Sequence, residues 1–280
     1  MFITHKGKIM KNKRNQKNII WKILLIIFSI VLIICLIIIG IQKYQQKKQQ
    51  EYYEALLENE STQTQATEEM PEPETEEAPD ILKSLGIEIP EKDIDFAALQ
   101  EENSDVYAWI YVPGTNVDYP VLQHPEDDTY YLEHNMDGSK GLPGCIYTES
   151  VNTKDFTDPN TVLYGHNMKN GSMFGSLKQY KNDGFYEKNA YFTVFTEDAA
   201  YRYQIFAYSD VPEDSDVYTT GYLPDETFDG FLTELLKSSY KDTGVTVGKD
   251  DKVLTLSTCS GDGLRFVVHA VRVDEHESGV

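Results

Sequence analysis

The sequence predicts a mainly β domain, folded as a closed barrel or a sandwich, that follows an N-terminal apolar helix. Three observations support this interpretation. From residue 106 onward the chain contains seven or eight short runs rich in β-branched and aromatic residues, separated by turn signals. One sizeable amphipathic helix is inserted before the last two runs. Ahead of them lies an uncharged apolar stretch of bilayer-spanning length.

The apolar stretch covers residues 23–41, which at a helical rise span roughly 28 Å. A cleaved signal peptide has a shorter apolar core of about 7–15 residues and a small-residue cleavage site, so the length favours an uncleaved signal anchor. Residues 1–22 carry seven Lys or Arg and no acid, against three lysines just after the stretch. Because basic flanks stay cytoplasmic, the sequence predicts a single-pass protein with residues 1–22 inside and everything after the anchor outside.

Residues 42–80 are predicted to form an extracellular acidic stalk. Its first part could continue as a helix, whereas residues 61–80 are acidic, proline-containing and almost without apolar residues, so we expect them to be disordered. The folded domain is predicted over residues 81–280. Residues 51–280 contain 46 acidic and 15 basic residues, which gives a formal charge of −31. This charge argues against nucleic acid as a partner.

The folded part begins with a short helix, because Asp95 is a plausible N-cap ahead of Phe96 and Leu99. Residues 106–123 form two strands around a Pro-Gly turn. Two further short strands follow at 144–149 and at 160–167, the latter ending near His166.

The second half continues with a helix at 171–180, based on Met173, Phe174 and Leu177. Residues 190–211 predict a hairpin. An amphipathic helix at 224–240 presents one apolar face: Phe228, Phe231, Leu232, Leu235 and Leu236. The last two strands lie within 253–273.

Chemistry is indicated at the turn between these last strands. Cys259 ends the first strand, and Arg265 begins the second after a glycine-containing turn. If the strands pair, Arg265 lies near Cys259, where a guanidinium could stabilise a thiolate and an oxyanion. The alternative is a disulfide between Cys259 and Cys145, since these are the two cysteines outside the apolar stretch. No zinc-type cysteine spacing occurs, and we expect neither a metal nor a cofactor.

A nucleophilic thiol also needs an acid or base. Of the six histidines, His166 is the best placed, because it ends an apolar strand and opens a loop between Gly165 and Asn167. His269 lies inside the last strand, where we expect it to pack in the core.

The sequence "TLSTC" at 255–259 with the downstream Arg265, together with "YGHNM" at 164–168, resembles the sortase family. The similarity is greatest to class B, which also shares "YYLEHNMDG" at 130–138, "GSMFGSL" at 171–177 and a long helix before the cysteine strand. It covers roughly residues 86 to 274. The resemblance implies a closed eight-stranded sortase-type β-barrel with an N-terminal helix.

The resemblance also implies a membrane-tethered cysteine transpeptidase at the surface of a Gram-positive-type cell. Cys259 would be the nucleophile, His166 would protonate the leaving amine, and Arg265 would hold the oxyanion. The substrates would be surface proteins or pilins with a C-terminal sorting signal, cut after a Thr. The acyl group would pass through a thioester to an amine of a cell-wall precursor or of a pilin lysine.

Four substrate-binding residues are predicted. Ser257 shares a strand face with Cys259, Leu132 lies in the class B-like "YYLEHN" segment, and Val217 and Tyr218 lie in the loop where family members bind the sorting signal. The interval from Cys259 to Arg265 is shorter than in many sortases, so the turn must reverse quickly. We interpret Asp262 as a turn-forming residue.

Two other functions stay open at this point. A cell-wall cysteine peptidase of another fold usually has its Cys at a helix start, ahead of its His, which is the reverse of the order here. A tethered adhesion domain with a Cys145–Cys259 disulfide would carry no chemistry, and a free, reactive Cys259 would exclude it.

Overall fold

A computed structural model of the chain describes residues 3–63 and 89–277. The chain divides into two compact units, with the boundary after Gln50. Most of the predicted disordered segment, residues 64–80, lies outside the described residues.

The first unit consists of the greater part of helix α1 (Ile3–Gln63). Within α1, Leu24–Leu57 is long and apolar enough to cross a membrane, judged by length and composition. Its apolar side chains are open to the surroundings; Leu25 and Phe28, for example, are 61% and 66% exposed. This helix is compatible with the predicted anchor.

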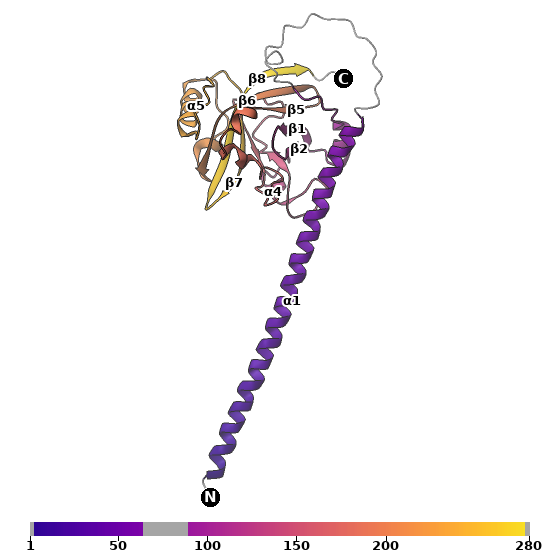
Figure 1. Cartoon of the computed structure of the whole chain (residues 1–280), viewed down its shortest axis with the longest axis vertical. Coiled ribbons are helices and arrows are strands. Elements are labelled where there is room, and N and C mark those ends of the chain that lie inside the picture. Colours follow the sequence, from indigo (N-terminus) through magenta and orange to yellow (C-terminus); the bar gives the residue numbers. More distant parts are fainter. Residues whose placement is uncertain (1–2, 64–88, 278–280) are drawn as a thin grey trace, which may run out of the picture. The chain divides into compact units, whose positions relative to one another are not determined.

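The second unit contains a closed barrel of eight strands, as the sequence resemblance implied (Figure 1). Around the barrel the order is β1-β2-β3-β4-β7-β8-β6-β5, and β5 pairs with β1 to close it. The strands are β1 (Val106–Val112), β2 (Val117–Leu122), β3 (Ile146–Thr148), β4 (Asn160–Tyr164), β5 (Tyr191–Phe195), β6 (Ala199–Pro212), β7 (Val253–Gly261) and β8 (Leu264–Glu277).

The barrel interior is filled by alternate apolar residues of these strands. Ile110, Leu163, Leu256 and Val268 are among those with no exposed surface. Outside the barrel, helix α3 (Phe96–Glu102) covers Trp109 and its neighbours. Its predicted N-cap is confirmed, because the Asp95 carboxylate accepts a hydrogen bond of 2.8 Å from the Ala98 amide.

Helix α5 (Glu226–Ser238) packs on the outer face of the barrel beside β6 (Figure 1). Its buried face consists of Phe228, Phe231, Leu232 and Leu235, as predicted, whereas Leu236 is 38% exposed. The helix is therefore held by one apolar stripe against Phe206 and Val267 of the sheet.

The predicted helix at 171–180 is wrong. Only a 3₁₀ helix, η1 (Leu177–Lys181), forms there. Met173 has a φ of +53°, which an α-helix cannot contain. Met173, Phe174 and Leu177 are nonetheless fully buried, so their apolar pattern reports a packed loop rather than a helical face.

The C-terminal part of α1 belongs to the barrel unit, which begins at Glu51 rather than at residue 81. The side chain of Tyr53 is 6% exposed, and its ring meets the Tyr119 ring edge-on, with 5.2 Å between centroids. Its hydroxyl donates to the Gly144 carbonyl at 3.2 Å. A segment assigned to the stalk thus supplies a buried aromatic side chain to the barrel.

We predict that Tyr53→Ala destabilises a fragment covering residues 51–280 by about 3 kcal/mol, because the change leaves a cavity against Tyr119. Urea denaturation would measure the loss. Leu223→Ala is the control, since Leu223 is 70% exposed and its truncation should change stability by about 0.5 kcal/mol at most. Equal midpoints for the two variants would show that α1 contributes nothing to this unit.

Candidate active site

Three neighbouring strands bring Cys259, His166 and Arg265 to one level of the barrel. Strands β4 and β7 are parallel, with Tyr164 paired to Ser257, so continuing the register by two residues brings His166 beside Cys259. Strand β8 is antiparallel to β7 and pairs Arg265 directly with Cys259. Since paired residues on adjacent strands point to the same face, the three side chains share one face of the barrel.

Two hydrogen bonds extend the pairing beyond the end of β4. The Gly165 amide donates to the Ser257 carbonyl at 3.1 Å. The Asn167 side chain then donates to the Cys259 carbonyl at 2.7 Å. The loop that carries His166 is therefore fixed to the strand that carries Cys259.

The short turn between Cys259 and Arg265 has a specific geometry. Asp262 and Gly263 have φ values of +50° and +75°, and Gly261 pairs with Leu264 around them. Two central residues with positive φ are typical of a tight hairpin turn. The register shifts between Cys259 and Gly261, so Ser260 is an extra, bulged residue. This turn brings Arg265 opposite Cys259 within six residues and gives Asp262 its expected turn role.

All three cysteines are free, so the Cys145–Cys259 disulfide is absent. Cys259 is exposed at the strand tip, whereas Cys145 is 1% exposed and its thiol donates to the His134 carbonyl at 3.5 Å. Burial raises the pKa of the Cys145 thiol to about 12. Only Cys259 of these two is accessible for chemistry.

His166 is oriented by the segment that contains Leu132. Its Nε2 lies 2.7 Å from the Leu132 carbonyl oxygen. Because a carbonyl oxygen only accepts, Nε2 carries the proton, and Nδ1 is left to exchange one. A Cβ on Gly144 would lie 3.4 Å from the His166 ring and 2.6 Å from the Tyr131 carbonyl, so glycine is needed where these segments meet.

The Arg265 guanidinium is oriented by an acidic residue that the sequence analysis missed. Its Nη2 donates to Glu213 at 3.0 Å, and its Nη1 donates to the Leu264 carbonyl at 3.3 Å. Glu213 directly follows β6, whose Val211 pairs with Arg265 across the sheet. No local pattern marks Glu213, since its partner lies 52 residues away.

A groove of about 490 Å³ surrounds these three residues. Three predicted substrate-binding residues line it: Leu132, Tyr218 and Ser257. The Tyr218 hydroxyl and Ser257 Oγ are 3.0 Å apart. Val217 does not line the groove; it is 6% exposed and packs with the α5 cluster, because the loop turns its neighbouring side chains to opposite sides.

The other wall of the groove carries residues that the sequence analysis did not single out. The rings of Tyr147 and Tyr164 stack at 5.4 Å between centroids, and Tyr218 continues the row at 6.1 Å from Tyr164. The Tyr164 hydroxyl donates a hydrogen bond to the Glu149 carboxylate. Partial burial raises the pKa of the Glu149 carboxyl. The groove thus combines flat aromatic surface with a few polar groups.

A series of buried hydrogen bonds holds the loop that carries Tyr218. The Asn160 amide donates to the Thr219 carbonyl at 2.9 Å and accepts from Thr255 Oγ1 at 3.2 Å. Thr255 Oγ1 in turn lies 2.9 Å from His269 Nδ1. Burial lowers the pKa of His269 to about 3, so it stays neutral in the core, where the sequence placed it.

This arrangement is suited to nucleophilic acyl transfer. An accessible thiol provides the nucleophile, an imidazole can donate or accept a proton, and a guanidinium can bind a developing oxyanion. None of these three roles requires a metal or a cofactor.

Comparisons with known proteins agree with this chemistry. The model of the Sortase domain family matches residues 110–273. Sortase B of Listeria monocytogenes is 35% identical over 161 residues, which cover 58% of this chain and 65% of that protein. The chain thus matches slightly less than two thirds of the length of this relative.

Solved structures show the same relationship. Clostridium perfringens sortase B superposes with a TM-score of 0.59 and 34% identity, covering 64% of this chain and 99% of that one. A Staphylococcus aureus sortase B–substrate complex superposes with a TM-score of 0.60 and 29% identity, covering 64% and 84%. With its barrel, its site geometry and these similarities, the chain belongs to the sortase family, and within that family to class B.

Proposed function

We propose that this protein is a membrane-anchored transpeptidase that cleaves the C-terminal sorting signal of surface proteins after a Thr. The acyl group is held as a thioester on Cys259 and then passes to an amine. The observation that carries this proposal is the strand register, which sets Cys259 directly opposite Arg265 and level with His166.

In the first step His166 Nδ1 takes the proton of the Cys259 thiol, and the resulting thiolate attacks the carbonyl carbon of the Thr. A C–S bond forms, and the carbonyl oxygen becomes an oxyanion that the Arg265 guanidinium binds. The C–N bond then breaks, and His166 gives a proton to the leaving amine. Glu213 orients the guanidinium for this step through its 3.0 Å contact with Nη2.

In the second step an amine replaces the thiolate. The amine belongs to a cell-wall precursor or to a pilin lysine, and His166 takes up the proton that the attacking nitrogen loses. The C–S bond breaks as the new amide forms, which restores the free Cys259.

The groove binds the sorting signal in an extended conformation. Leu132 offers an exposed apolar side chain on one side, and the stacked tyrosines offer a flat wall on the other. Tyr218 and Ser257 supply hydroxyls close to the nucleophile. The S. aureus sortase B solved as a substrate complex supports a peptide site on this fold.

The predicted domain order places this chemistry outside the cell. Residues 1–22 form a basic cytoplasmic segment, and residues 23–41 form the membrane anchor. Residues 42–50 lead from the anchor to the catalytic unit, which begins at Glu51 and includes the C-terminal end of α1.

We predict that the full chain in detergent forms a thioester with a sorting-signal peptide, visible as an acyl adduct in intact-protein mass spectrometry. Peptides of the LPxTG and NPxTN types would be compared. Cys259→Ala should form no adduct, and His166→Ala should form product far more slowly, because the leaving amine lacks its proton donor. Leu142→Ala, at an exposed residue outside the groove, is the control. Adduct formation by Cys259→Ala would contradict the assignment.

The two cysteines of the barrel unit should differ in thiol reactivity. Iodoacetamide at pH 8 should label Cys259 rapidly and leave Cys145 unlabelled until the chain is unfolded. The raised pKa of about 12 keeps the Cys145 thiol protonated at this pH, and burial blocks access. Peptide mapping of the labelled protein would measure both rates. Protection of both residues in the unreduced protein would instead indicate a disulfide.

We predict that Arg265→Ala and Arg265→Lys both lower kcat by about 10²–10³, equivalent to roughly 2.7–4 kcal/mol, with little change in KM. Lysine keeps the charge but lacks the planar fork that binds Glu213 and the oxyanion together. Arg272→Lys, on the same strand but beside Glu275, is the control and should keep nearly full activity. Activity of Arg265→Lys equal to that of the control would remove the oxyanion role.

A further inference from the structure

The end of helix α1 that belongs to the barrel unit reaches the segment that orients His166. The Tyr53 hydroxyl donates to the Gly144 carbonyl at 3.2 Å and lies 3.8 Å from Cys145 Sγ. Burial raises the pKa of this hydroxyl well above its ordinary value, so it remains a hydrogen-bond donor at neutral pH. A side chain of α1 therefore holds the backbone of residues 144 and 145.

Residues 144 and 145 in turn hold the backbone that accepts a hydrogen bond from His166. The Cys145 amide donates to the Tyr131 carbonyl at 3.0 Å. The next carbonyl oxygen, that of Leu132, lies 2.7 Å from His166 Nε2. Gly144 also borders the imidazole directly, because a Cβ on it would lie 3.4 Å from His166 Cδ2 and 3.2 Å from the Leu132 oxygen. A shift of this segment would move both the acceptor and the neighbour of the imidazole ring.

A second set of contacts leads from Tyr53 to the loop that carries His166. The Tyr53 ring meets the Tyr119 ring edge-on, with 5.2 Å between centroids. The Tyr119 hydroxyl accepts a hydrogen bond of 3.2 Å from the Met173 amide. The next amide, that of Phe174, donates to the His166 carbonyl at 3.0 Å. The ring of Tyr53 thus supports the backbone of His166, while its hydroxyl supports the surroundings of the imidazole.

The two sets of contacts meet at the side chain that moves protons in the proposed reaction. We propose that Tyr53 is a positioning residue for His166. Packing of Tyr53 on the barrel sets the Leu132 carbonyl, which keeps the proton on Nε2 and leaves Nδ1 to exchange a proton with Cys259 and with the leaving amine. This inference rests on the proposed transpeptidase function, because it assigns His166 both proton transfers.

The test compares the full chain in detergent as wild type, Tyr53→Phe and Tyr53→Ala, with the sorting peptide that forms the adduct. Tyr53→Phe keeps the ring against Tyr119 and loses the hydrogen bond to Gly144, so kcat should fall about fivefold. Tyr53→Ala loses both sets of contacts, and kcat should fall by about 10–10². KM should change by less than about twofold, because none of the residues that Tyr53 contacts above lines the groove.

The tautomer of His166 gives a readout that a merely structural role would not change. In the full chain labelled with nitrogen-15 histidine, the nitrogen chemical shifts show which ring nitrogen carries the proton, at a pH where the ring is neutral. The spectrum of His166→Ala identifies the signal. The wild type should show the Nε2–H form that the Leu132 carbonyl selects. Tyr53→Phe and Tyr53→Ala should show an increasing share of the Nδ1–H form.

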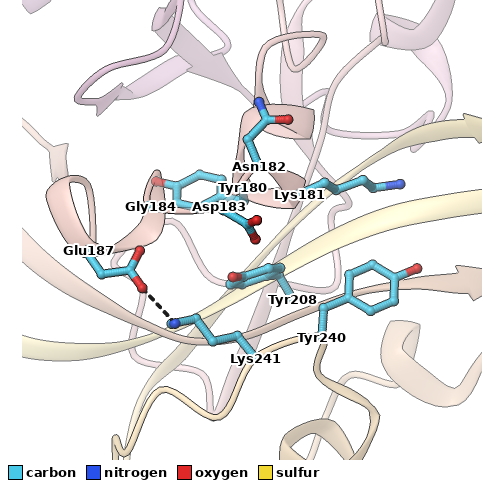
Figure 2. Close-up of a pocket in the computed structure, with 9 residues that line it drawn as sticks. All are labelled: Tyr180, Lys181, Asn182, Asp183, Gly184, Glu187, Tyr208, Tyr240 and Lys241. Atoms are coloured by element: carbon cyan, nitrogen blue, oxygen red, sulfur yellow. Dashed lines mark ion pairs between the residues drawn. The ribbon is translucent and has the colours of Figure 1, made fainter.

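Tyr186 provides matched controls elsewhere in the barrel unit. Its side chain is 8% exposed, against 6% for Tyr53, and its hydroxyl donates to the Ile205 carbonyl at 3.1 Å. It precedes Glu187, whose 2.7 Å ion pair with Lys241 borders a pocket that shares no lining residue with the groove (Figure 2). Tyr186→Phe and Tyr186→Ala should lose stability as the Tyr53 variants do, yet keep the wild-type kcat and the Nε2–H form of His166.

Two results would overturn the inference. Equal kcat values for the Tyr53 and Tyr186 variants would mean that Tyr53 contributes only stability. A lower kcat with an unchanged His166 tautomer would mean that the effect does not pass through the imidazole. If Tyr53→Ala does not fold, Tyr53→Phe decides both points. A wild type that forms no thioester would instead remove the proposed function, and the tautomer comparison, which needs no substrate, would still decide whether Tyr53 positions His166.

Discussion

The parallel pairing of β4 with β7 is the constraint on which the site depends. Parallel neighbours end at the same edge of a sheet, so a histidine after one strand and a cysteine at the end of the other arrive side by side. The pairing is fixed by burial: Leu163 of β4 and Leu256 of β7 face each other with no exposed surface. A slip of β7 by one residue would turn Leu256 outward and move Cys259 to the barrel interior. The free energy of core packing therefore maintains the geometry of the three reactive side chains.

The bulge at Ser260 gives the strand tip two different sides. A regular hairpin would continue the alternation after Cys259, whereas the extra residue lets the chain reverse through Asp262 and Gly263 and still set Arg265 opposite Cys259. It also leaves the Ser260 hydroxyl within reach of Lys181.

The parts of this structure that the sequence could predict are those set by local patterns. The strand runs, the α5 stripe and the Asp95 cap follow from periodicity and capping, and the pairing of Cys259 with Arg265 follows from a single short hairpin. The parts it could not predict depend on distant partners. Glu213 meets Arg265, Asn167 meets Cys259 and Tyr53 meets Gly144 across 52, 92 and 91 residues. Met173 shows that a local pattern can also mislead. The apolar spacing around it is typical of a helix, whereas its positive φ belongs to a packed loop.

The buried hydrogen bonds from Asn160 through Thr255 to His269 support the groove loop. They do so without placing a charged group in the core. A protonated His269 would have no counter-ion there, and burial lowers its pKa to about 3. In the unfolded chain the same histidine titrates near its ordinary value of 6.5, so the unfolded state binds more protons between these two values. This histidine therefore lowers the stability of the fold as the pH falls below about 6.5. At neutral pH it is uncharged in both states, and the support of Tyr218 is insensitive to pH. Changes of activity with pH near neutrality must then arise in the groove itself, among the groups that contact the substrate.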